Sequence, residues 1–247
     1  MTAMTKFLGA AAVIAMFAGA AQAADVDAAP DSPSWTGGYI GVVGGYGWGD
    51  SSYESSAVDS TTLLPIIGSE QDGSVDFEGF LIGGQLGYDF DFGNGFVLGV
   101  AGDMSWSDMD GTKCVQFPVC TGSPDDTHSY ADVDWLATIR GRAGFTTGSM
   151  LIYGTGGLAI AGAEATITYV DGTLDTPRRD SNTHYGWVIG AGAEFMIAEN
   201  MSLGAEYLHV DLGSEDYTFP GPGGGIDVLS ESDLKINIVR ASLNLRF

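Results

Sequence analysis

The chain has 247 residues, with 38 glycines, 8 prolines and a formal net charge of −23 at pH 7. This length suits one large all-β domain, and the charge argues against nucleic acid or an anionic membrane surface as a partner, because both would repel the protein. Intrinsic disorder is the competing interpretation of so acidic a chain, but a hydrophobic content of 45% and an aromatic content of 11% argue against it.

The first 23 residues predict a secretory signal peptide. Lys6 precedes the apolar run FLGAAAVIAMFAGA, and small residues precede the expected cleavage between Ala23 and Ala24. A membrane-spanning helix is the alternative, but the run is shorter than the roughly 20 residues that a bilayer core requires. We expect an acidic linker over residues 24–34 and one domain over residues 35–247. No later stretch is long and apolar enough to span as a helix, so the exported chain either stays soluble or crosses a membrane in another way.

Eight segments alternate large apolar residues with small or polar ones, at the period of two that is typical of β-strands. In the fifth segment both faces are apolar or small, so its position between its neighbours supports the prediction as much as its pattern does. In the seventh, the alternation becomes uncertain after Tyr207. In chain order the segments are residues 35–48, 79–91, 96–106, 135–145, 150–164, 185–197, 201–212 and 236–247.

Connections of alternating length join these segments. Short turns occur at residues 93–95, 147–149 and 198–200, and the Gly-Asn-Gly sequence of the first is typical of a tight hairpin. The other connections are long and polar, at residues 49–75, 108–132, 165–184 and 213–233. We therefore predict an all-β fold: an eight-stranded antiparallel transmembrane β-barrel with three short periplasmic turns and four long external loops.

Two cysteines, Cys114 and Cys120, lie six positions apart in the polar sequence KCVQFPVC. In an exported protein this spacing predicts a disulfide that closes a small loop. Metal binding is the alternative, but no histidine or third cysteine lies beside them. We predict neither a metal site nor a cofactor.

The apolar face of each strand is expected to contact lipid, and the other face to line the lumen. Closure is required because lipid cannot satisfy the hydrogen bonds of an open sheet edge. Aromatic residues near the strand ends predict two girdles at the membrane interfaces. One girdle comprises Trp48, Trp106, Trp135 and Trp187, and the other comprises Tyr88, Phe90, Phe96, Phe145, Phe195 and Phe247.

Charged residues of both signs fall on the face that is expected to point inward. A buried charge without a partner is very costly, so we expect these residues to pair across the lumen. Eight strands leave room only for side chains, which favours structural filling over a proton or ion relay. The predicted lumen charge network consists of Asp89, Asp103, Arg140, Arg142, Glu194, Glu206, Arg240 and Arg246.

A soluble eight-stranded barrel of the lipocalin type is the main structural alternative. Such a barrel would enclose a ligand with apolar residues and would expose polar residues to water. In this chain one face is small, glycine-rich and charged while the other is large and aromatic, which is the inverse arrangement.

The chain resembles the small porin-family outer-membrane β-barrels of alphaproteobacteria, the major surface antigen group that is similar to opacity-type proteins. The resemblance covers Trp35 to Phe247 and is least specific in the loops. It implies a barrel in the cell outer membrane, inserted by the barrel assembly machinery, which reads a carboxy-terminal strand that ends in Phe; Phe247 matches that signal. The matching stretches are WTGGYIGVVGGYGWG, GGQLGYDFDFGNGFVLGVAGDMSWSD, WLATIRGRAGFTTGSMLIYGTGGLAIA, GWVIGAGAEFMIAENMSLGAEYLHVDLG and VRASLNLRF.

Three functions compete. The favoured one is a structural or surface protein that contributes to envelope integrity and displays acidic loops. Its expected partners are outer-membrane lipid and lipopolysaccharide, and peptidoglycan and host surface molecules are further candidates. The second is a porin-like pore for small solutes, although filled eight-stranded lumens conduct poorly.

The third function is a lipid-modifying enzyme, for which three histidines are candidate bases: His128 beside Ser129, His184, and His209 near Asp211. A serine hydrolase needs its nucleophile, base and acid within hydrogen-bond reach, and these residues show no recognised spacing. We therefore predict no enzymatic activity. Acidic loop residues could bind divalent cations, but solvated loop charge is the favoured interpretation.

Overall fold

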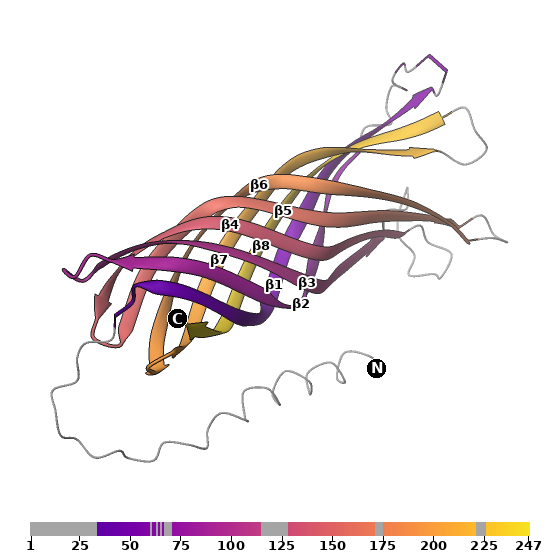
Figure 1. Ribbon diagram of the computed structural model, residues 1–247. Helices are drawn as coiled ribbons and strands as arrows, with labels where there is room; N and C mark the ends of the chain where they lie inside the picture. Colours follow the sequence, from indigo (N-terminus) through magenta and orange to yellow (C-terminus); the bar gives the residue numbers. More distant parts are fainter. Residues whose placement is uncertain are drawn as a thin grey trace, which may run out of the picture. The chain divides into compact units, whose positions relative to one another are not determined.

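Eight antiparallel strands form a closed barrel, in which each strand pairs with its sequence neighbours and the last pairs with the first (Figure 1). The computed structural model describes residues 34–59, 61–62, 64, 66, 71–114, 128–170, 175–220 and 226–247. The predicted fold class is therefore confirmed. The strands are β1 (Gly37–Asp59), β2 (Gln71–Asp91), β3 (Phe96–Cys114), β4 (His128–Thr147), β5 (Met150–Val170), β6 (Asp175–Ala198), β7 (Met201–Pro220) and β8 (Ile226–Arg246).

The ladder of paired residues is staggered around the barrel. Trp48 of β1 pairs with a residue of β8, and the line of paired residues can be followed from there through β7 and the remaining strands to β2. This line returns to β1 at Gly38, ten residues before Trp48. A stagger of this kind tilts the strands, and with eight strands it leaves an interior just wide enough for side chains. The lumen is therefore a packed core.

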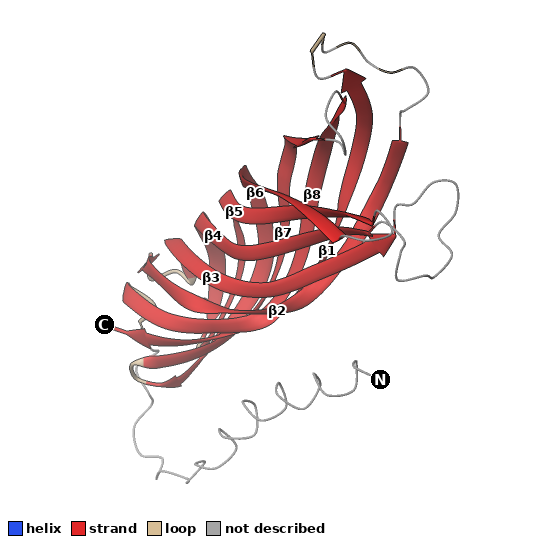
Figure 2. Cartoon of the chain, turned by 90° about the vertical axis from the view of Figure 1, so that its right-hand side faces the viewer, coloured by secondary structure: helices blue, strands red, loops and turns tan. Residues whose placement is uncertain are grey.

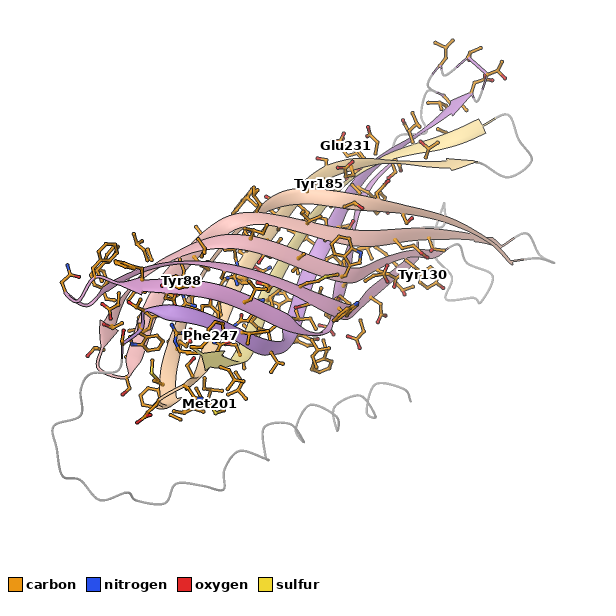
Figure 3. The ribbon with its side chains drawn as sticks, viewed as in Figure 1. Tyr88, Tyr130, Tyr185, Met201, Glu231 and Phe247 are labelled. Carbon is orange, nitrogen blue, oxygen red and sulfur yellow. The ribbon has the colours of Figure 1, made fainter. Side chains whose placement is uncertain are left out.

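Large apolar side chains cover the outer surface of the barrel. Ile82, Ile139 and Leu158 are each about two-thirds exposed, at 69%, 71% and 67%, whereas Arg140 is only 3% exposed. Tyr88 and Phe247, labelled in Figure 3, are among the exposed aromatic residues. This orientation suits a barrel that meets lipid, and it is the inverse of a soluble, ligand-enclosing barrel.

Aromatic residues lie near both ends of this lipid-facing band. At the outer end Trp106 pairs directly with Trp135. At the periplasmic end Phe96 pairs with Phe145, and their ring centroids lie 5.4 Å apart. Such girdles mark the two membrane interfaces of a barrel.

The three short turns close the periplasmic end. In two of them glycines adopt positive φ angles, 75° at Gly93, 87° at Gly95 and 61° at Gly148. Residues with a Cβ rarely adopt these angles, so glycine allows the chain to reverse within a few residues.

At the outer ends the structure differs from the sequence prediction. Much of the four stretches expected as loops continues the strands: residues 49–59, 71–75, 108–114, 128–132, 165–170, 175–184, 213–220 and 226–233. Beyond a bilayer the outward face of a sheet meets water rather than lipid, so it need not be apolar and the alternation of apolar and polar residues disappears. Backbone hydrogen bonds nevertheless extend the sheet.

Beyond the lipid-facing band the barrel divides into two sheets. The ladder between β2 and β3 ends where Glu78 pairs with Asp110, and the ladder between β6 and β7 ends where Trp187 pairs with Asp211, although all four strands continue. One sheet therefore contains β7, β8, β1 and β2, and the other contains β3 to β6. Figures 1 and 2 show the outer ends of the two groups diverging.

The predicted signal peptide, its cleavage between Ala23 and Ala24, and the acidic linker lie outside the described residues, apart from Ser34. These assignments stay predictions. Within the described ranges, no helix is long and apolar enough to cross a membrane.

Candidate functional site

Two sets of ion pairs cross the lumen, and each contains two arginines and two carboxylates. We call Asp103, Arg140, Glu206 and Arg240 the outer ring, and Asp89, Arg142, Glu194 and Arg246 the periplasmic ring. The structure thus brings together all eight residues of the predicted lumen charge network.

In the outer ring each arginine contacts both carboxylates. The guanidinium nitrogens of Arg140 lie 2.8 Å from Asp103 and 2.7 Å from Glu206. Those of Arg240 lie 3.0 Å from Asp103 and 2.7 Å from Glu206. The hydroxyl of Thr138 donates to Asp103 at 2.8 Å and accepts from Nε of Arg140 at 2.9 Å. The ring therefore connects β3 and β4 to β7 and β8 through the lumen.

The periplasmic ring has the same closed pattern. Arg142 lies 3.1 Å from Asp89 and 3.0 Å from Glu194, and Arg246 lies 2.7 Å from Asp89 and 3.0 Å from Glu194. Its members come from β2, β4, β6 and β8, so that every second strand contributes one charge. The amide of Asn244 also donates to Glu194 at 3.1 Å.

Each ring is electrically neutral and almost completely excluded from solvent. The side chains of the outer ring are at most 9% exposed and those of the periplasmic ring at most 6%. Burial of charges is tolerated when good geometry and additional hydrogen bonds compensate for the lost hydration. Each guanidinium contacts two carboxylates, and in the outer ring every one of these ion pairs is also a hydrogen bond or is supported by one. In the periplasmic ring the contact between Nε of Arg142 and Oδ1 of Asp89, at 3.1 Å, is an ion pair without a hydrogen bond.

Trp35 covers the periplasmic ring and is completely buried. Its indole ring centroid lies 4.8 Å from the guanidinium carbon of Arg246, and its carbonyl oxygen accepts from Arg246 at 2.8 Å. The indole nitrogen donates to the carbonyl of Gly148 at 3.5 Å. The sequence pattern predicts Trp35 only as the start of a strand and does not indicate this cation–π contact inside the lumen.

An apolar layer fills the lumen on the external side of the outer ring. Leu208 and Ile238 are the next inward-facing residues after the ring on β7 and β8, and Leu136 follows Thr138 on β4; all three are at most 3% exposed. The prediction of a uniformly small and charged inward face was therefore wrong for the outer half, where both faces of these strands are apolar. The layer comprises Phe77, Leu81, Met109, Val133, Leu136, Ala159, Ala161, Ala163, Val188, Leu208, Val210, Leu212, Leu234, Ile236 and Ile238.

Inward-facing glycines make room for the rings. A Cβ atom added at Gly99 would lie 2.2 Å from a carboxylate oxygen of Asp89. Gly99→Ala is expected to destabilise the barrel by about 1–3 kcal/mol, because an overpacked core must shift its side chains or backbone. Urea unfolding of the detergent-refolded protein measures this effect.

The matched control is Gly102→Ala on the same strand. A Cβ there would face lipid, and its nearest atom would be the carbonyl oxygen of Thr138 at 3.7 Å. We expect little change from this substitution. Equal losses at Gly99 and Gly102 would show that the periplasmic ring is not tightly packed.

Phe247 lies where β8 meets β1 at the periplasmic end. Its backbone nitrogen donates to Gly38 at 2.9 Å and its carbonyl oxygen accepts from the nitrogen of Gly38 at 2.9 Å. Its side chain is 82% exposed. The terminal aromatic residue thus projects from the barrel rather than into it.

The remaining candidate residues whose side chains are described, His184 and His209, are not brought together. His184 is buried, and His209 lies on the outer surface, where its Nδ1 lies 3.0 Å from Oδ1 of Asn237. The side chains of His128 and Ser129 lie outside the described residues. The predicted disulfide also stays a prediction, because Cys120 and the side chain of Cys114 are not described.

Comparisons with known proteins agree with this architecture. A family model described as the outer membrane protein beta-barrel domain matches residues 9–247. The 31 kDa outer-membrane immunogenic protein of Brucella melitensis biotype 1 is 35% identical over 250 residues, which cover 96% of this chain and 98% of that protein. The 22 kDa outer membrane protein of Rhizobium leguminosarum bv. viciae is 31% identical over 193 residues, covering 76% and 71%. Among solved structures, OprG from Pseudomonas aeruginosa matches 86% of this chain and 97% of its own, with 12% identity and a TM-score of 0.45.

Proposed function

This chain belongs to the family of outer membrane protein β-barrel domains, and from that membership we propose that it is a structural and surface protein that contributes to envelope integrity. Its location is the cell outer membrane. The observation that carries the proposal is the filled lumen. Two neutral rings and an apolar layer occupy the space that a pore would need.

The ion pairs also support a mechanical role. A barrel wall is otherwise held by hydrogen bonds between neighbouring strands, whereas the rings connect strands that are not neighbours, such as β4 to β7 through Arg140 and Glu206. Deforming the barrel would separate buried charges from their partners, and that is costly in a low-dielectric interior. Such a barrel would resist deformation by stresses in the membrane.

Display of an acidic surface is the second part of the proposal. The backbone N–H groups of Thr62 and Thr61 donate hydrogen bonds to the carboxylate of Asp59. These bonds hold the pKa of this carboxyl below its usual value, and the bond from Thr62 has the larger effect. The sheet of β7, β8, β1 and β2 carries few cations at its outer end, where Figure 3 labels Glu231. The acidic residues there whose side chains are described are Asp50, Glu54, Asp59, Asp72, Asp76, Glu78, Asp211, Glu215, Asp216, Glu231 and Asp233.

A pore is the alternative function, and planar-bilayer recording distinguishes it from the structural role. The refolded native protein is expected to give no stable channel, because water and ions find no open path through the apolar layer. A porin with a wide, water-filled lumen serves as the positive control. Steady openings of uniform size would reject the structural proposal.

We also propose that the chain is not an enzyme. The two relatives described above are named as outer-membrane proteins, one of them immunogenic, and neither name states a catalytic activity. His209 contacts the amide of Asn237 rather than a carboxylate that could orient a catalytic base.

The proposal of a structural and surface protein also includes its assembly and its partners. We propose that the barrel assembly machinery inserts the chain, with Phe247 as its signal. We also propose that the barrel contacts lipopolysaccharide, peptidoglycan or host molecules.

A further inference from the structure

Three polar side chains form a connected group on the lipid-facing surface of β7 and β8. The hydroxyl of Tyr207 donates to Oδ1 of Asn237 at 2.7 Å, and Nδ1 of His209 lies 3.0 Å from the same oxygen. Because this oxygen accepts, Nδ1 of His209 carries the hydrogen in this arrangement. We call Tyr207, His209 and Asn237 the polar triad.

The polar triad has no counterpart on the opposite part of the lipid-facing band. There Met104 of β3, Ile139 of β4 and Leu158 of β5 are exposed and apolar, at 45%, 71% and 67%. Polar groups that face lipid are costly unless they are satisfied. Contact with hydrocarbon therefore does not explain why polar side chains occur on this one side of the barrel.

The polar triad lies at the depth of the outer membrane–water interface. Asn237 pairs directly with Trp48 on one side and with His209 on the other. The ring of Trp187 lies 5.7 Å from that of His209. Tryptophans of a barrel lie at the level of the lipid headgroups, so the triad faces headgroups rather than the ends of acyl chains.

The chemistry of the polar triad suits a sugar. Both of its hydrogen bonds end on Oδ1 of Asn237, so they leave the amide nitrogen of Asn237 as a donor and Nε2 of His209 as an acceptor. A sugar hydroxyl both donates and accepts, and the indole rings of Trp48 and Trp187, 40% and 47% exposed, offer apolar surfaces beside these groups.

Local charge argues against a bare phosphate as the recognised group. Lys235, two residues further out than Asn237 on β8, is opposite Asp211 and Asp50, and its ammonium group is bound to Asp233 at 2.9 Å. Three carboxylates against one ammonium leave this part of the surface anionic. An uncharged sugar ring is therefore favoured over a phosphate.

We propose that the polar triad, with Trp48 and Trp187, binds the sugar headgroup of a glycolipid in the outer leaflet. The inference rests on the location in the outer membrane and is independent of the structural role proposed above. A bound headgroup supplies the hydrogen-bond partners that hydrocarbon cannot. It would hold one lipid type against β7 and β8.

The test compares vesicles of phosphatidylcholine alone with vesicles that also contain glucosyl diacylglycerol, an uncharged glycolipid. The glycolipid is expected to raise the urea midpoint for unfolding of the inserted native protein. Asn237→Leu should remove at least half of this increase. His209→Phe serves as the second variant, and Met104→Leu as the control that keeps the full increase.

Two further measurements distinguish recognition of a glycolipid from recognition of a lipid phosphate and from recognition of a free sugar. Phosphatidylglycerol vesicles present an anionic phosphate without a sugar, and soluble methyl glucoside presents a sugar without a lipid. Neither is expected to raise the midpoint as the glycolipid does. The proposal is overturned if either gives an equal increase, or if Asn237→Leu and His209→Phe both respond to the glycolipid as the native protein does.

Discussion

Arg140→Leu is expected to destabilise the barrel by about 3–5 kcal/mol, the usual loss when one partner of a buried ion pair is removed. In the native protein Asp103 and Glu206 share Arg140 and Arg240. Without Arg140, the two carboxylates have one guanidinium between them, and one negative charge stays buried without compensation. Urea unfolding of the refolded protein in detergent measures the loss as a lower midpoint at an unchanged slope.

The double variant Arg140→Leu/Glu206→Leu tests the cause. It leaves Asp103 and Arg240 as a neutral pair at 3.0 Å, so part of the lost stability should return despite the second substitution. Additivity of the two losses would show that pairing is not the source of the effect. Glu194→Leu, in the periplasmic ring, should give a comparable loss by itself. None of these variants should conduct ions, because the apolar layer remains.

The eight strands could be predicted because a barrel wall between lipid and lumen requires alternation. Even the ambiguous fifth segment forms β5, since its neighbours on both sides needed a partner strand. The outer ends could not be predicted in the same way. Residues such as Ser52 and Ser55 belong to β1 without alternation of apolar and polar residues around them, because the outward face there meets water and need not be apolar.

The charged residues of the lumen could be predicted individually, because each falls between lipid-facing apolar neighbours. Their partners could not, since contacts across the lumen depend on the stagger of the strands. Arg142 on β4 and Glu194 on β6, for example, lie 52 residues apart in sequence, and β5 lies between their strands. The apolar layer could not be predicted because the alternation reverses after Tyr207: Leu208 and Val210 point inward and are apolar, whereas His209 between them points outward and is polar.

Trp35→Ala is expected to cost about 3–5 kcal/mol, the range observed when a buried large aromatic residue is truncated. Trp35 packs in a cluster with Val97, Leu151, Tyr153 and Met196 at the periplasmic end. Its removal would leave a cavity and would take the indole ring from the guanidinium of Arg246. The sequence could not reveal this role, because it depends on the path of the chain before β1.

The control for Trp35→Ala is Trp106→Ala, since Trp106 is 63% exposed on the lipid-facing surface. Its loss should cost less, because detergent fills the vacated space. Fluorescence of variants that keep a single tryptophan gives an independent measurement: brominated lipid should quench Trp106 and leave Trp35 unquenched, because of these two only Trp106 lies on the lipid-facing surface. Trp35→Phe keeps an aromatic ring and should retain much of the lost stability. If Trp35→Ala unfolded at the native urea concentration, Trp35 could not close the periplasmic end, and the periplasmic ring would hold its geometry without it.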